Sequence, residues 1–146
     1  MTGAGNPAYD RLAIRQGFFL ILLSLLGGVV APFMVNSRMG VGAHTLGILG
    51  GIVLILLGVI RPMFRREPHL WRPLYLCWLV ALYANWANTL LAGLTGASHL
   101  TPLAGAGTTG AMWAEAIVFV VFVLVGVTSI LGALIAVYAL RPMPGE

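Results

Sequence analysis

Apolar residues run through this chain in four long stretches, separated by short segments in which charged residues, prolines and glycines gather. The stretches cover about residues 12–35, 43–60, 73–94 and 112–140. Each reaches or approaches the roughly 20 residues that a helix needs to cross about 30 Å of hydrocarbon. A spanning segment must satisfy its own backbone hydrogen bonds, which a helix does. The pattern therefore predicts four membrane-spanning helices.

Composition supports a membrane protein. The 146 residues are 60% hydrophobic and only 8% charged, whereas a soluble domain carries about 25% charged residues. The length fits a single domain, residues 1–146. We expect an all-α, integral membrane four-helix bundle in the cell inner (cytoplasmic) membrane, in contact with lipid. Residues 29–31, Val-Val-Ala, resemble a signal-peptide cleavage site, but the absence of a clean polar boundary favours retention of the first helix.

The eight basic residues, all of them arginine, are divided unequally between the two sides of the membrane. Seven lie near the termini or in the loop between the second and third stretches: Arg11, Arg15, Arg61, Arg65, Arg66, Arg72 and Arg141. Only Arg38 lies on the other side. Because arginine-rich segments stay in the cytoplasm, we predict that both termini and the 61–72 loop are cytoplasmic. No aromatic platform is interleaved with these arginines, so we expect no nucleic-acid partner.

Four polar residues within the predicted membrane segments cluster toward the non-cytoplasmic side. They are His44, Asn85, Asn88 and Glu115. The two amides lie about 9–14 Å deep at the 1.5 Å rise of a helix. Because polar groups within a membrane mark functional sites by default, we expect these four residues to line one cavity. The alternative for the amides is that they only bond one helix to another.

The helical faces suggest what such a cavity could hold. At about 100° per residue, His44, Gly47 and Gly51 share one side of the second helix, and the glycines leave a flat shelf for a planar group. The alternative is a small-xxx-small motif, in which the glycines let two helices approach closely.

Aromatic residues accompany the amides on the third helix. Trp78 and Ala92 share the face of Asn85 and Asn88, and Trp86 stands about 100° from Asn85. This arrangement suits a small aromatic ligand, and it is equally normal in helix packing. A single well-placed histidine such as His44 suits a haem whose other face stays open for substrate.

Several segments resemble a known enzyme family. NSRMGVGAH (36–44), YANWANTLLAGLTGA (83–97), TPLAGAG (101–107) and WAE (113–115) are similar to the hydroxylaminobenzene mutases, which are related to the styrene oxide isomerases. The resemblance runs from about Leu12 to Leu140. It implies a homotrimer that holds haem b, with His44 matching the histidine that ligates the iron. The family's WAN matches Trp86, Ala87 and Asn88.

Three positions depart from the pattern and direct the choice between the two activities. Gly50 and Ala92 stand where the epoxide isomerases carry an asparagine and a tyrosine that position the epoxide, and Leu46 replaces an acidic residue frequent in the mutases. The resemblance therefore implies a mutase, an isomerase that moves the hydroxyl of an arylhydroxylamine from nitrogen to the ring and gives an aminophenol. Epoxide-to-carbonyl rearrangement is the alternative.

The roles follow from this resemblance. We expect ferric haem on His44, with Gly47 and Gly51 beneath, to act as a Lewis acid. Asn85 and Asn88 hold the polar end of the substrate, and Glu115 either moves a proton or pairs with Arg38. The residues expected to hold the aromatic ring are Trp78, Trp86 and Ala92.

Two other classes remain as alternatives. A small four-helix multidrug exporter uses a glutamate in its first helix, but the first helix here has no acidic residue after Asp10. A non-enzymatic haem or assembly subunit is the second.

The arginine distribution gives a direct test of topology. A reporter fused after Glu146 should be cytoplasmic, and one inserted near Ala104 should be external, because seven of the eight arginines lie on the first side. Paired alkaline phosphatase and green fluorescent protein fusions measure this. A cytoplasmic result at both sites would show that the count of four spans is wrong.

Overall fold

The computed structural model describes residues 7–66, 68–105 and 107–141, and it is helical throughout its regular elements. The long helices are α1 (Pro7–Val30), α2 (Ser37–Ile60), α3 (Pro68–Thr95) and α5 (Met112–Ala139). The short ones are η1 (Ala31–Phe33), η2 (Arg61–Arg66) and α4 (Pro102–Gly105). All four long helices are long and apolar enough to cross a membrane, in agreement with the predicted number of helices, while the bounds of the spans stay a prediction. Residues 1–6 and 142–146 of the predicted domain lie outside the described residues.

The predicted and observed boundaries differ most at the start of the third helix. The sequence predicts a start at Pro73, but α3 begins at Pro68 and carries Pro73 inside it. A proline this close to a helix start removes only one backbone hydrogen bond. The added turn brings Trp71 into the core, where its side chain is 6% exposed.

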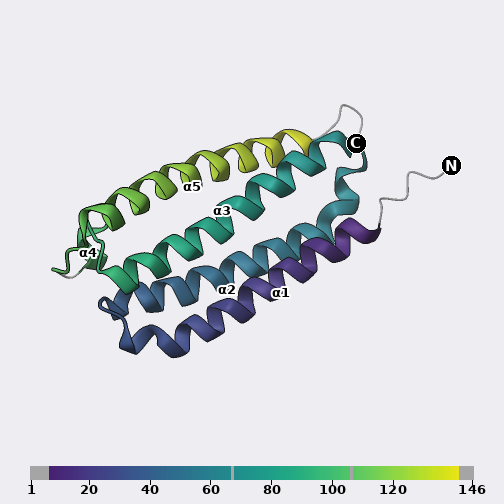
Figure 1. Cartoon of the computed structure of the whole chain (residues 1–146). Coiled ribbons are helices and arrows are strands. Elements are labelled where there is room, and N and C mark those ends of the chain that lie inside the picture. Colours follow the sequence, from purple (N-terminus) through teal and green to yellow (C-terminus); the bar gives the residue numbers. More distant parts are fainter. Residues whose placement is uncertain (1–6, 67, 106, 142–146) are drawn as a thin grey trace.

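The four long helices form an open row rather than a bundle closed around one core. α1 packs on α2, α2 on α3 and α3 on α5, so α1 and α5 are the two edges (Figure 1). Lipid is as apolar as a leucine side chain, so the hydrophobic effect does not drive the row to close. Side chains on α5 accordingly remain exposed, and only 11% of its most apolar segment is buried within the chain.

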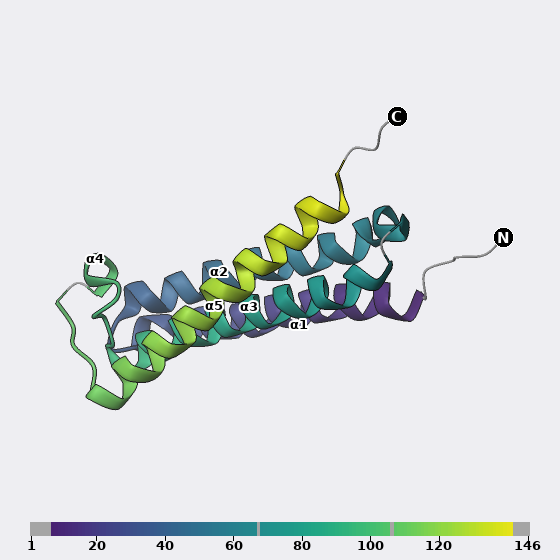
Figure 2. The same ribbon diagram turned by 90° about the horizontal axis from the view of Figure 1, so that it is seen from above.

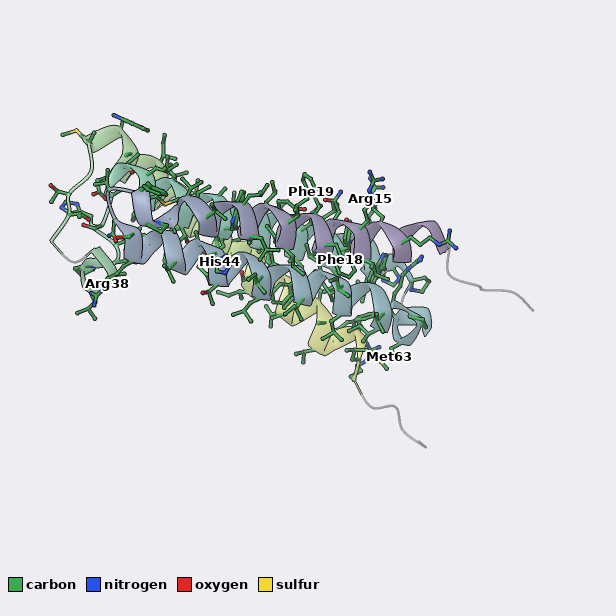
Figure 3. The ribbon with its side chains drawn as sticks, turned by 90° about the horizontal axis from the view of Figure 1, so that it is seen from below. Arg15, Phe18, Phe19, Arg38, His44 and Met63 are labelled. Atoms are coloured by element: carbon green, nitrogen blue, oxygen red, sulfur yellow. The ribbon has the colours of Figure 1, made fainter. Side chains whose placement is uncertain are left out.

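The two ends of the row are distinct. Figure 2 shows the segment that carries α4 at the end opposite the beginning of α1, and Figure 1 shows that α5 ends at the same end of the row as the beginning of α1. Arg15 and Arg38 lie toward opposite ends (Figure 3). This arrangement is what the arginine-based topology requires, while the side of the membrane on which each end lies stays a prediction.

Small residues bring α1 and α2 into backbone contact. Gly17 faces Gly51, and a Cβ added to either glycine would lie 2.5 Å from the carbonyl oxygen of the other. One helical turn before Gly51 on α2, Gly47 packs directly on the side chain of Ser24. The seam formed by Gly17, Ser24, Gly47 and Gly51 therefore matches the helix-packing interpretation of the glycines. The expected open shelf is not present, because α1 covers it.

Two clusters of buried residues hold the row together. At the end where α1 begins, α1, α2 and α3 bury Leu20, Leu54 and Leu74 completely. The aromatic residues Phe64, Trp71 and Tyr75 belong to the same cluster, and the guanidinium of Arg61 lies 5.5 Å from the Trp71 ring centroid. At the opposite end, a second cluster joins α2, α3 and α5 and consists of Met39, Ala92, Ala97, Ala114 and Val118.

The glycine seam can be tested with a matched pair of substitutions. Gly51→Ala should destabilise the protein by about 1–3 kcal/mol, because the new methyl group collides with the backbone of Gly17. Gly126→Ala on α5 should be neutral or stabilising, since a Cβ there meets nothing within 4 Å. Thermal unfolding in detergent, followed by tryptophan fluorescence, measures both. Equal midpoints for Gly51→Ala and the parent protein would contradict the seam.

Candidate active site

His44 lies on the side of α2 that meets α1, and its imidazole is half-buried (Figure 3). Its Nδ1 atom is 2.8 Å from the carbonyl oxygen of Ser24. A carbonyl oxygen only accepts hydrogen bonds, so in this contact Nδ1 carries the hydrogen. The other ring nitrogen, Nε2, then carries the lone pair and is free to act as a metal ligand.

A glycine of α1 makes room for the His44 ring. A Cβ added to Gly28 would collide with Nδ1 and would lie 2.9 Å from Cγ of the imidazole. The neighbouring Gly27 is different, because a Cβ there would meet only Leu90, at an ordinary 3.6 Å. Sequence analysis missed Ser24 and Gly28. The only sequence signal was the Gly27–Gly28 pair, and the register between α1 and α2 is not readable from it.

Trp86 belongs to the same region as His44. Its ring packs against Gly47, the glycine that also contacts the Ser24 side chain. Nε1 of Trp86 and Oγ of Ser24 are both buried, and neither has a hydrogen-bond partner among the described residues. Three helices thus place His44, Trp86 and Ser24 around one stretch of the α1–α2 seam.

Asn88 faces the other edge of the row, toward α5. Its side chain is 7% exposed, and its Nδ2 donates to the carbonyl oxygen of Val118 at 3.1 Å. This bond links α3 to α5, as the helix-bonding alternative expected. The remaining atom, Oδ1, is buried and accepts no hydrogen bond among the described residues. The amide of Asn88 is therefore fixed in position, and its oxygen Oδ1 is an acceptor without a donor among the described residues.

The other predicted residues of α3 have varied surroundings. Asn85 is half-buried, and its backbone carbonyl accepts a hydrogen bond from the Thr89 hydroxyl at 2.9 Å. Trp78 packs on Gly132 of α5, where a Cβ would lie 3.0 Å from its Nε1. Ala92 is 1% exposed inside the cluster that includes Ala114. It is packed in the interior, so the structure does not place it on an open binding surface.

Glu115 has partners that the sequence did not predict. Its Oε1 accepts hydrogen bonds from the backbone N–H groups of Ser98 at 2.9 Å and Gly110 at 3.2 Å, and its Oε2 accepts from His99 at 3.1 Å. Arg38 instead directs its guanidinium at the carbonyl oxygen of Leu103, at 3.5 Å. The expected pairing of Glu115 with Arg38 is wrong, because backbone amides nearer in the chain occupy the carboxylate.

The four polar residues are therefore not brought together within one chain. His44 faces α1, Asn88 faces α5, and Glu115 binds the segment between α3 and α5. What one chain assembles is a histidine with a fixed tautomer at one edge of the row and a buried amide acceptor toward the other. A ligand that needs both requires more than one chain, or a displacement of the helices.

Comparison with known proteins identifies relatives along almost the whole chain. A family model described as styrene oxide isomerase matches residues 9–141. Hydroxylaminobenzene mutase HabB of Ectopseudomonas oleovorans is 31% identical over 146 residues, covering 99% of this chain and 89% of that protein. Hydroxylaminobenzene mutase HabA of the same organism is 39% identical over 92 residues, covering 61% of this chain and 67% of that protein. No solved structure matches the chain significantly.

Proposed function

The chain belongs to the styrene oxide isomerase family, and from this we propose that it is a membrane-bound mutase that rearranges an arylhydroxylamine to an aminophenol. Membership in this family makes it an isomerase. The choice of reaction within the family is supported by the name of its relatives, one of which is 31% identical over nearly the full chain. The remaining support comes from the residues themselves.

The unused acceptor of Asn88 is the observation that carries the proposal. A buried polar atom without a partner costs about 1–3 kcal/mol, and inside a membrane no water relieves that cost. An arylhydroxylamine offers both an N–H and an O–H donor. Binding either one to Oδ1 of Asn88 would satisfy that atom and orient the polar end of the substrate. The bond to Val118 holds the amide in place while this happens.

The site of His44 fits a haem b. Among the described residues there is no group of three His, Cys, Asp or Glu side chains that could hold a metal ion. The other ligands of an iron bound at His44 would therefore come from a cofactor, such as the four nitrogen atoms of a porphyrin. Ser24 holds the imidazole with Nε2 available, and Gly28 leaves space for the ring. Such an iron would supply Lewis-acid chemistry at the N–O bond.

The open row supports assembly into a closed ring of subunits, which we propose is a homotrimer. His44 faces α1 and Asn88 faces α5, so one chain in this conformation does not present both to the same molecule. In a closed ring of identical subunits, the His44 edge of one subunit can meet the α3–α5 side of the next. Trp78, Trp86 and Asn85 are half-buried in the isolated chain and would contact the aromatic ring and its substituents there. The predicted location is the cell inner membrane.

The alternatives explain less of the structure. At Gly50, where epoxide isomerases carry asparagine, a Cβ would already lie 3.2–3.3 Å from Leu20 and Leu82, and Ala92 is enclosed as well. Neither position offers space for a residue that positions an epoxide. An exporter needs a carboxylate that exchanges protons with the transport path, but Glu115 is occupied by three backbone amides.

The haem proposal is tested by absorption spectroscopy on three variants. The detergent-purified protein should show a strong Soret band, and His44→Ala should remove it. Gly28→Ala should weaken or remove it by displacing the imidazole, whereas Gly27→Ala should not, because its Cβ has room. A colourless parent protein made with ample haem supply would contradict the proposal.

The role of Asn88 is tested by turnover of phenylhydroxylamine to aminophenol. Asn88→Ala should reduce turnover per haem about 10- to 150-fold, corresponding to a lost hydrogen bond of about 1.5–3 kcal/mol to a charge-bearing transition state. Thr89→Ala is the matched control, because its hydroxyl bonds only to its own helix. Haem content and oligomer size should be measured on the same preparations. Normal turnover by an Asn88→Ala protein with weakened assembly would reduce Asn88 to a helix-bonding residue.

A further inference from the structure

The segment between α3 and α5 is tied down by side chains from two helices that are distant in sequence. Asn36 precedes α2, and Glu115 lies in the first turn of α5. Within the segment, the Ser98 hydroxyl donates to the Thr108 carbonyl, and the Thr108 hydroxyl donates to the Gly105 carbonyl at 2.7 Å. The segment is therefore a folded unit with two external attachments.

Glu115 forms the first attachment. Its carboxylate joins Ser98 and His99, just after α3, to Gly110, just before α5. Ala111, the N-cap residue of α5, makes no side-chain capping bond. Glu115 therefore fixes where α5 begins relative to where α3 ends.

Asn36 forms the second attachment. Its Nδ2 lies 3.1 Å from the carbonyl oxygen of Ala104, 3.2 Å from that of Gly105 and 3.3 Å from Oγ1 of Thr108. Its Oδ1 accepts from the N–H of Met39, and its own N–H donates to the carbonyl of Gly93 at 2.9 Å. One buried residue thus ties the segment to the start of α2 and the end of α3.

The attached segment lies next to the hydrogen bond that fixes Asn88. Val118 is three residues after Glu115, on the adjacent turn of α5, and belongs with Ala97 and Ala114 to one buried cluster. The Asn88–Val118 bond is 3.1 Å long. Each residue of a helix advances the chain by about 1.5 Å, so a slide of α5 along α3 by one residue would lengthen and misalign this bond.

We propose that Glu115 and Asn36 are positioning residues, which latch the segment between α3 and α5 and so keep the Val118 carbonyl in register with the amide of Asn88. The latch orients Oδ1 of Asn88 toward the substrate without touching the substrate itself. Its effect on catalysis rests on the proposed function, whereas the latch itself does not. Glu115 acts here as an acceptor for amides and transfers no proton.

Turnover kinetics separate this role from proton transfer. Glu115→Gln keeps an oxygen that can accept from Ser98 and Gly110, as Oε1 does, so kcat should stay within about threefold of the parent. Glu115→Ala should lower kcat about tenfold or more, with a smaller change in KM, because α5 loses its register. Asn36→Ala, which removes no titratable group, should lower kcat in the same way. Because Glu115→Ala and Asn36→Ala disrupt the same latch, the double variant Glu115→Ala/Asn36→Ala should have a kcat little lower than that of either single variant.

Arg38→Ala is the matched control. Its guanidinium approaches the same segment only at the exposed carbonyl of Leu103, at 3.5 Å, so kcat should stay within about twofold of the parent. A loss of 10²- to 10⁴-fold in Glu115→Gln, with Asn36→Ala unaffected, is what proton transfer would give and overturns the proposal. Unchanged kcat per folded protein in Glu115→Ala and Asn36→Ala also overturns it.

Hydrogen–deuterium exchange tests the latch without any substrate. Peptides that cover residues 96–110 and the first turns of α5 should exchange faster in Glu115→Ala and Asn36→Ala, and Glu115→Gln should differ from the parent mainly at His99. If exchange does not rise in the alanine variants, no latch exists. If exchange rises but the parent protein does not turn over phenylhydroxylamine, the proposed function fails and the latch stands.

Discussion

A polar atom inside a bilayer can bond only to protein or to a bound molecule, and this constraint sets the arrangement of the polar side chains in this protein. His44 Nδ1 uses the Ser24 carbonyl, Asn88 Nδ2 uses the Val118 carbonyl, and Glu115 uses three backbone amides. Oδ1 of Asn88 is left over. In water such an atom would be hydrated, but inside a bilayer only a bound molecule or another protein group can satisfy it. Nε1 of Trp86 and Oγ of Ser24, which also lack partners among the described residues, have the same requirement.

The open row has consequences for where a reaction can take place. A soluble four-helix protein closes around a central core to remove apolar surface from water. Here lipid covers that surface, so α1 and α5 can stay apart as two edges. The interior of a single chain then consists of three helix–helix junctions. This is why we propose that the site for an aromatic substrate lies between subunits, where two edges of the row would meet.

Local patterns predicted what depends on local chemistry. Four spans follow from hydropathy, and His44 and Asn88 stand out because polar residues are rare in such segments. The contacts that the sequence did not predict depend on the register between residues that are distant in the chain. The bond from Asn36 to Ala104 joins positions 68 apart, and that of His44 to Ser24 joins positions 20 apart. The pairing of Glu115 with Arg38 failed for a different reason, since charge alone does not reveal that backbone amides nearby in the chain will bind the carboxylate.

The glycines of α2 show how a packing motif can serve a functional residue indirectly. Gly47 and Gly51 do not form a surface for a planar group, because α1 occupies that side. Their small size lets α1 approach until the Ser24 carbonyl reaches Nδ1 of His44 and Gly28 lies against the ring. A larger residue at Gly51 would push α1 away and lengthen the bond that fixes the histidine tautomer. The close approach of α1 and α2 is therefore what sets the orientation and the tautomer of the His44 imidazole.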